Sequence, residues 1–212
     1  MKFILKENLG LIVKQLFIFD PISLFQQIKQ FLIWTNDKTK SPPHIIKQLV
    51  IMFYAKKYQL NIFIETGTFL GHMVDAMKNN FCNIYSIELS EKLYKKAKKK
   101  FAASKHINIF HGNSGEILSH LLKDIKEPCL FWLDGHYSAG ITAKGETETP
   151  ILQELNHILN HPILNHVILI DDARCFGKEK DYPTLAYIKE FITTRNRTYK
   201  IEIADDIIQI YN

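Results

Sequence analysis

The chain has 212 residues, of which 46% are hydrophobic and 23% charged, and its formal net charge is +5. This length and apolar content suffice for one domain with a substantial core, and they exclude a chain that is disordered throughout. Much of the basic excess lies in one run, EKLYKKAKKK, at residues 91–100. No aromatic ladder accompanies that run, so a solvated helix face is favoured over contact with nucleic acid or an anionic membrane.

The cysteines and the first residues bear on location. The three cysteines form no CxxC pair, which fits a reducing cytosol better than a disulfide framework, and Cys129 opens an apolar segment as an expected buried thiol. Charged residues interrupt residues 1–20, so that segment is predicted to be neither a signal peptide nor a membrane span. We therefore expect a cytoplasmic protein whose first segment is an amphipathic helix. That helix would dock on the domain or on a second subunit of a homodimer, and peripheral membrane contact stays open.

The pattern then indicates a helical extension before the main domain. Pro21 breaks the opening segment, and residues 22–34 follow with apolar side chains at helical spacing. The polar stretch TNDKTKSPP, at residues 35–43, has the composition of a linker. It divides the chain into an extension at 1–40 and a domain at 41–212. Ser41 is a candidate cap for a helix that continues to about Tyr58.

From residue 61 onward, short apolar runs alternate with helical stretches. We expect strands at 61–65, 83–88, 107–111, 129–134 and 166–171, and helices near 71–80, 90–104, 114–126, 147–160 and 183–196. This alternation predicts right-handed β–α–β units and a parallel sheet. The segments YKIEIA and IIQIYN, joined only by Asp205 and Asp206, predict a closing antiparallel hairpin. The expected fold class is α/β, with a doubly wound, Rossmann-like, mostly parallel sheet and a helical N-terminal extension.

A nucleoside site is expected where the first two strands end, because open α/β sheets bind ligands outside the carboxyl ends of their strands. The first strand runs into a loop, Glu65-Thr66-Gly67-Thr68-Phe69-Leu70-Gly71, and the second strand ends in Glu88. Gly67 permits a tight turn, and Gly71 lets the next helix begin near the strand. Glu88 is placed to accept hydrogen bonds from ribose hydroxyls. The alternative is an ordinary β–α turn with a capping role for Glu65 or Thr66.

The glycine spacing favours S-adenosylmethionine over a nicotinamide dinucleotide. The loop is not GxGxxG, and Glu65 would repel a pyrophosphate but suits the ammonium group of an amino acid. After the third strand, Asn113 can accept a hydrogen bond from the adenine amino group through its amide oxygen, with Ser114 beside it. Capping of the following helix by Asn113 or Ser114 is the alternative.

Three carboxylates follow the fourth and fifth strands. Asp134 closes the segment CLFWLD, and Asp171 and Asp172 close HVILIDD. Neighbouring parallel strands would bring these acids to one edge of the cofactor cleft, where hard oxygen ligands suit Mg²⁺. The ion would offset the repulsion between the acids, hold a substrate hydroxyl and lower its pKa. The alternative is capping of the following segments, with Asp172 paired to Arg174.

Four motifs carry a family resemblance. The segments ETGTFLG, IELS, LDGH and IDDAR occur in this order, and the chain from about Asn61 onward resembles class I S-adenosylmethionine-dependent methyltransferases. Asp134 with the Asp171-Asp172 pair resembles the Mg²⁺ site of the macrocin O-methyltransferase family, which methylates sugar hydroxyls on natural products. The resemblance implies transfer of a methyl group to a hydroxyl of a small molecule or glycan. The GHYSAGIT loop and the long helical lead-in depart from that family, which leaves the acceptor open.

The loop after Asp134 holds the candidate bases. His136 lies on a glycine-flanked loop, and its near-neutral titration suits a general base for the acceptor hydroxyl. The alternatives for His136 are a positioning residue and an ordinary loop histidine. Asp134 would be a metal ligand and a second candidate proton acceptor, and Lys144 is a further candidate base. Residues 137–149 are expected to form a lid that excludes water and shapes the acceptor pocket.

Other residues have plainer interpretations. His157 and His161 share a helix face at i, i+4, which can bind zinc, but without a third ligand nearby a solvated face is favoured. Phe69, Leu70 and Trp132 are expected in the core or in the pocket wall.

Rival functions stay open beside the metal-dependent O-methyltransferase. One is a metal-independent N- or O-methyltransferase that uses His136 as base. Another is a non-catalytic nucleoside-binding module whose N-terminal helices form the working surface. A nicotinamide-dependent dehydrogenase is disfavoured by the glycine spacing.

Overall fold

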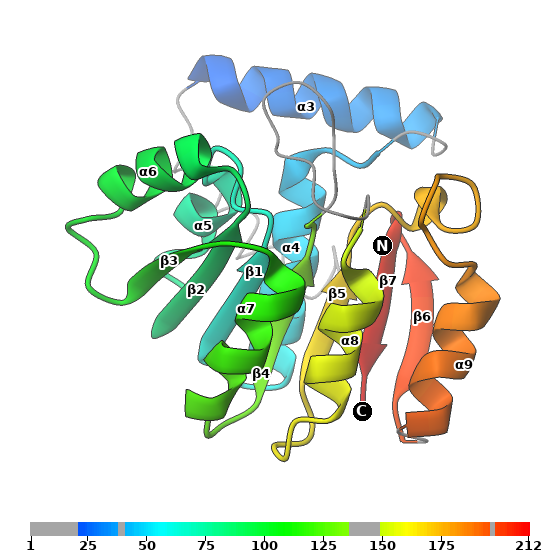
Figure 1. Cartoon of the computed structure of the whole chain (residues 1–212). Helices are drawn as coiled ribbons and strands as arrows, with labels where there is room; N and C mark the ends of the chain where they lie inside the picture. The colour runs from blue at the N-terminus through cyan, green and yellow to red at the C-terminus, as the bar shows by residue number, and fades with distance from the viewer. Residues whose placement is uncertain (1–20, 38–40, 136–148, 196–197) are drawn as a thin grey trace.

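A seven-stranded sheet organises the part of the chain that the computed structural model describes, residues 21–37, 41–135, 149–195 and 198–212 (Figure 1). The strand order is β3-β2-β1-β4-β5-β7-β6. The first five strands pair in parallel, and β7 pairs antiparallel with both β5 and β6. This confirms the expected doubly wound sheet with a closing hairpin. The strands are β1 Ile62–Thr66, β2 Asn83–Glu88, β3 Ile107–His111, β4 Cys129–Leu133, β5 Val167–Ile170, β6 Lys200–Ala204 and β7 Ile207–Tyr211.

Helices cover both faces of this sheet, and Figure 1 shows α7, α8 and α9 on the near face with α4 behind. From α4 onward they lie inside the expected stretches, whereas α3 begins at Pro21 and continues to Asn36, into the stretch expected as a linker. Two single-turn 3₁₀ helices, η1 Leu122–Asp124 and η2 Ala173–Cys175, follow α7 and β5. The α-helices are α3 Pro21–Asn36, α4 His44–Lys57, α5 His72–Met77, α6 Glu91–Lys100, α7 Ser114–Leu121, α8 Ile151–Leu159 and α9 Leu185–Arg195.

The central strands β1, β4 and β5 are largely apolar because both of their faces are buried. Side chains alternate between the faces, so Phe63 of β1 and Leu169 of β5 join the core beneath α4 and α5. Their neighbours Ile64 and Ile168 join the second core, beneath α7, α8 and α9. Every residue of β1, β4 and β5 is buried, which explains the unbroken apolar runs in the sequence.

The closing hairpin turns on two aspartates. Asp205 and Asp206 both have positive φ, 54° and 63°. A two-residue hairpin turn with φ positive at both central positions matches the right-handed twist of its strands, and aspartate tolerates this conformation better than most side chains. The turn fixes the register in which Ile207 pairs with Ala204.

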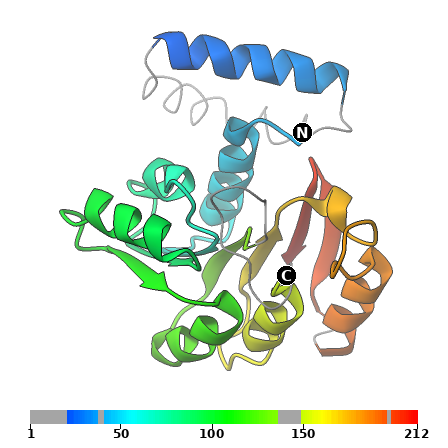
Figure 2. The ribbon, with the colours of Figure 1, turned by 45° about the horizontal axis from the view of Figure 1, so that its top comes forward.

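At the N-terminal end, α3 lies beyond the carboxyl ends of the parallel strands, next to the start of α4 (Figures 1 and 2). Trp34 of α3 is buried in the same core as α4. The capping role predicted for Ser41 is wrong, because α4 begins at His44 and its N-cap residue, Pro43, makes no side-chain cap. Residues 1–20, with the predicted amphipathic helix, lie outside the described residues, and the division at residue 40 stays a prediction. Among the described residues, no helix is long and apolar enough to cross a membrane.

Candidate functional site

The glycine loop after β1 brings the first strand close to Asp134. Gly67 has φ +86°, and a Cβ built there would lie 2.4 Å from the backbone oxygen of Asp134. The Asp134 N–H donates to the carbonyl of Thr66 at 3.1 Å, so β4 continues to pair with β1 beyond its last strand residue. Gly71, with φ +69°, is the N-cap residue of α5. The expected tight turn is therefore present, and only glycine fits at position 67 without displacing the backbone at Asp134.

Glu65 is a buried carboxylate beneath this loop, 2% exposed. Ser86 Oγ donates to Glu65 Oε2 at 2.5 Å, and Thr68 Oγ1 lies 2.6 Å from Ser86 Oγ. Because the Ser86 proton is committed to Glu65, Thr68 is the donor to Ser86. Burial raises the pKa of Glu65 well above its usual range, the Ser86 hydrogen bond opposes this shift, and Asp134 and Glu88 add to it. A cationic ligand group nearby would stabilise the ionised form.

Glu88, at the end of β2, is held by backbone N–H groups. Phe69 N–H donates to Oε2 at 2.7 Å, and Ser90 N–H donates to Oε1 at 2.8 Å. Ser90 itself caps α6. Each carboxylate oxygen has two lone pairs, so the fixed carboxylate keeps acceptor capacity for the hydroxyls of a ribose.

Asn113 serves as the cap of α7, which was one of its two expected roles. Its Oδ1 accepts from Gly115 N–H at 3.0 Å, and Ser114 is the buried first residue of the helix. Contact of Asn113 or Ser114 with an adenine stays a prediction.

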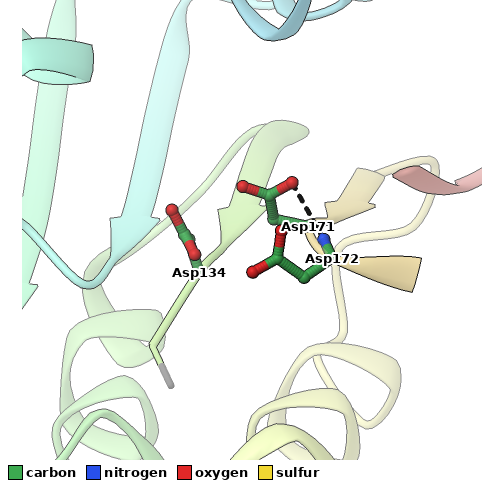
Figure 3. Close-up of side chains that lie close together, drawn as sticks. All are labelled: Asp134, Asp171 and Asp172. Carbon is green, nitrogen blue, oxygen red and sulfur yellow. Dashed lines mark hydrogen bonds between the residues drawn. The ribbon is translucent and has the colours of Figure 1, made fainter. Parts of the chain in front are cut away.

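The three strand-end aspartates come together at the ends of β4 and β5 (Figure 3). One carboxylate oxygen from each of Asp134, Asp171 and Asp172 lies within 4.8 Å of the others. Asp171 is 3% exposed and Asp172 7%. Asp171 Oδ1 accepts from the Asp172 N–H at 2.8 Å, while Asp172 has φ +54°, a conformation that turns the chain directly after β5. Burial, and next the Asp134 carboxylate, raise the pKa of Asp171, and the contact with Lys47 opposes this shift. The cluster therefore favours an added positive charge.

Two cationic side chains contact this acid cluster. Lys47 of α4 forms an ion pair with Asp171 Oδ2, and its Nζ lies 3.9 Å from Asp172 Oδ1. Arg174 Nη1 donates to Asp172 Oδ1 at 2.8 Å, as the capping alternative anticipated, and also pairs with Asp206 Oδ2 from the hairpin turn. Asp206 Oδ1 further accepts from the Arg174 N–H at 2.8 Å. The hairpin turn thus fixes Arg174, and Arg174 fixes Asp172.

Sequence reasoning missed Lys47 and Asp206. Asp206 had been assigned only to the hairpin. A signal for Lys47 was present, because it is the single charged residue in the first eleven of α4, among apolar neighbours such as Ile46 and Leu49. The side chain of Lys47 is only 14% exposed. A charge embedded in an apolar helix requires a buried counter-charge, and that requirement points to the strand ends.

Several other candidates have clear outcomes. His136, Lys144 and residues 137–148 of the predicted lid lie outside the described residues. Trp132 is in the core at 1% exposed. Phe69 and Leu70 are 42% and 40% exposed, which excludes the core and leaves the pocket wall as their expected place.

The two histidines considered for zinc have structural partners, although only His157 lies in α8 and His161 follows the end of that helix. Cys129 is buried as expected. His157 Nε2 donates to the carbonyl of Gly115 at 2.8 Å. Cys129 N–H donates to His166 Nδ1 at 3.0 Å, which puts the imidazole proton of His166 on Nε2, and that proton goes to His161 Nδ1 at 3.0 Å. His161 Nε2 then donates to the carbonyl of Leu122 at 2.9 Å. Burial, and next His161, lower the pKa of His166 to about 4, so the His166 imidazole is neutral near pH 7. The favoured reading of a solvated face is wrong for His161, which is buried.

Comparison with known proteins defines the fold class. No protein-family model and no curated protein sequence matches the chain. Solved structures do match, among them the O-methyltransferase TomG from Streptomyces achromogenes, involved in tomaymycin synthesis and in complex with S-adenosylmethionine (13% identity, 87% of each chain, TM-score 0.58). An O-methyltransferase from Bacillus cereus in complex with S-adenosylhomocysteine matches at 13% identity over 92% of this chain and 93% of that one, with TM-score 0.58. The N-methyltransferase NodS from Bradyrhizobium japonicum WM9 matches at 10% identity over 78% and 94%, with TM-score 0.53.

The chain therefore has the Rossmann-like fold seen in S-adenosylmethionine-dependent methyltransferases. The three neighbours include both O- and N-methyltransferases, so the fold leaves the acceptor atom open. The narrower resemblance to macrocin O-methyltransferases stays a prediction.

Proposed function

We propose that the chain is an S-adenosylmethionine-dependent O-methyltransferase that acts on a hydroxyl of a small molecule or glycan, with Mg²⁺ held by Asp134, Asp171 and Asp172. The observation that carries the proposal is the acid cluster itself. Carboxylate oxygens from two strand ends converge within 4.8 Å, and the chain at Asp134 touches the glycine loop of a fold that methyltransferases share. Transfer of a methyl group requires that the cofactor and the acceptor are bound next to each other. A cofactor site and an acid site that both include Asp134 would place them in this way.

In this proposal, the ends of β1 and β2 bind the cofactor. Glu88 accepts hydrogen bonds from the ribose hydroxyls, because backbone N–H groups already fix its orientation. Glu65 lies on the side of the ammonium group, whose charge would favour the ionised carboxylate over the neutral form. Gly67 has no side chain, so the backbone of Asp134 can approach the glycine loop and lie beside the cofactor.

The acid cluster fits a hard divalent ion by its chemistry. Its three donors are carboxylates, two of them buried, and oxygen ligands of this kind are preferred by Mg²⁺. A bound Mg²⁺ would supply Lewis acidity, which holds an acceptor oxygen and lowers its pKa. Arg174 keeps Asp172 in place, and the ends of β4 and β5 set the direction from which an acceptor meets the cofactor. We expect most of the rate acceleration to come from this alignment. His136 remains our candidate for the base.

Calorimetry tests both halves of the proposal. S-adenosylhomocysteine is titrated into the wild type, Asp171→Asn and the exposed control Asp124→Asn, and Mg²⁺ is titrated separately into each. We expect all three proteins to bind the nucleoside, and we expect Asp171→Asn alone to lose the binding heat of Mg²⁺. Absence of nucleoside binding in the wild type would remove the cofactor assignment. Equal Mg²⁺ binding by wild type and Asp171→Asn would remove the metal site.

One observation favours a second candidate, a methyltransferase that works without a metal. Asp171 and Asp172 already contact cationic side chains, Lys47 and Arg174, which partly neutralise them. The discriminating measurement is methyl transfer to hydroxyl and amine acceptors in the presence of a chelator. Transfer that persists at its full rate supports the metal-free candidate, and binding of the cofactor without any transfer supports a nucleoside-binding module.

A further inference from the structure

Lys47 reaches the acid cluster from a helix that sequence reasoning left out of the site. It lies in α4, which packs on one face of the sheet, and its ammonium contacts Asp171 Oδ2. The two residues are 124 positions apart in the chain, so only the tertiary fold brings them together. The other oxygen of Asp171 accepts the N–H of Asp172. Both oxygens of the central carboxylate therefore have a partner, and one partner is a full positive charge.

The Lys47 ammonium lies on the side of the acid cluster where a metal ion would also bind. Its Nζ contacts Asp171 and lies 3.9 Å from Asp172 Oδ1, so it faces two of the three carboxylates that converge. Mg²⁺ binds carboxylate oxygens at roughly 2.0–2.1 Å, so an ion shared by Asp171 and Asp172 would lie within a few ångströms of the ammonium. Two cations at that separation repel strongly beside carboxylates that are buried.

The two cationic side chains, Lys47 and Arg174, differ in how easily a divalent ion could displace them. Arg174 is fixed from two directions, because Asp206 accepts both from its backbone N–H and from its guanidinium. The contacts described for the Lys47 ammonium are to the acid cluster alone, at the end of a flexible four-carbon stem. A divalent ion can therefore displace the ammonium by rotation of the lysine stem, whereas displacement of Arg174 would disturb the hairpin turn.

We propose that the Lys47 ammonium lies in the acid cluster of the metal-free protein, where its positive charge stabilises Asp171. The ammonium must move away from the cluster when a divalent ion binds there. This inference rests on the metal site of the proposed function. Metal binding is then an exchange of one cation for another, so its affinity is lower than three carboxylates alone would give. Lys47 also explains how the buried Asp171 is tolerated while no divalent ion is bound, since an unpaired buried charge is strongly destabilising.

Titration of Mn²⁺ followed by electron paramagnetic resonance of the free ion tests the exchange. The proteins are wild type, Lys47→Met, Lys47→Gln and the control Lys56→Met, which removes an exposed lysine from the same helix. We expect Lys47→Met and Lys47→Gln each to bind Mn²⁺ at least tenfold more tightly than wild type, and Lys56→Met to bind like wild type. The glutamine variant serves if the methionine variant does not fold.

A second readout follows thermal unfolding of the same proteins with and without Mn²⁺. We expect Lys47→Met to be less stable than wild type in a chelator, and to gain more from the ion, because it has lost the cation paired with Asp171. Unchanged or weaker Mn²⁺ affinity in both Lys47 variants overturns the inference, while the metal site stands if Asp171→Asn abolishes binding. Absence of Mn²⁺ binding in every protein overturns both the metal site and the exchange, and retained binding of S-adenosylhomocysteine would then still support the cofactor half.

Discussion

Gly67 offers a sharp test of how the site is built, through the substitution Gly67→Ala. The backbone there has φ +86°, and a left-handed conformation costs a residue with a Cβ about 1–2 kcal/mol. The new Cβ would also lie 2.4 Å from the oxygen and 2.9 Å from the carbonyl carbon of Asp134. Those atoms belong to the backbone, so β1 and β4 must move apart, and overpacking of this kind costs roughly 1–3 kcal/mol.

Gly177→Ala is the matched control. Gly177 has a similar φ, +75°, but the nearest atom to its Cβ would be a methyl carbon of Thr184 at 3.4 Å, an ordinary contact. Both variants therefore carry the free-energy cost of a left-handed backbone conformation, and only Gly67→Ala adds the steric clash. We expect Gly67→Ala to be less stable than Gly177→Ala by about 2 kcal/mol, a difference of roughly 4–8 °C in Tm for a domain of this size.

The assay combines thermal unfolding with titration of S-adenosylhomocysteine. Displacement of Asp134 from Thr66 should weaken nucleoside binding by about tenfold or more in Gly67→Ala, because the loop and Asp134 would no longer face one ligand together. Gly177→Ala should bind like wild type. Equal Tm values for the two variants, together with unchanged nucleoside affinity, would refute the close approach of β1 and β4 as the basis of the site.

Glu88→Gln should weaken binding of S-adenosylhomocysteine by about tenfold in calorimetry, through loss of charged hydrogen bonds, whereas the exposed Glu116→Gln should bind like wild type. Leu155→Ala, at a fully buried position, should lower the free energy of unfolding in urea by about 2–5 kcal/mol, and Leu164→Ala, at a side chain that is 59% exposed, by less than about 0.5 kcal/mol. Burial lowers the pKa of His166 to about 4 from 6.5, so its stabilising effect is complete above pH 6.5 and is lost as the pH falls toward 4. Between about pH 7.5 and about pH 5 this should remove about 2 kcal/mol from the free energy of unfolding, and a His166→Asn variant that loses as much over that range would contradict it.

The fold was accessible from the sequence because its signals are local. β2 and β3 have the bounds expected from their apolar runs, and the fourth and fifth strands end one residue early, before Asp134 and Asp171. The alternation of helices and strands then determines a parallel sheet, and a parallel sheet brings the ends of neighbouring strands together. Convergence of the three acids follows from that rule without knowledge of any side-chain position.

The contacts that the sequence did not reveal are those between elements far apart in the chain. A periodic pattern shows which face of α4 is apolar, but it does not show that the one lysine on that face points to the end of β5. Asp206 had a sufficient local explanation as a turn residue, which concealed its contact with Arg174. Ser41 failed as a cap for a different, local reason, because the helix begins at His44, after Pro42 and Pro43.

The sheet order also has a consequence for biosynthesis. β5 pairs with β7, which is made after β6, so the strand that carries the acid pair has one neighbour until residues 207–211 have left the ribosome. The same late segment brings Asp206, which anchors the arginine beside that pair. A nascent chain that lacks the hairpin would thus hold every proposed metal ligand and yet have an open sheet edge next to them. Release of the last strand, and not synthesis of the acids, should be the event after which the protein can retain a divalent ion.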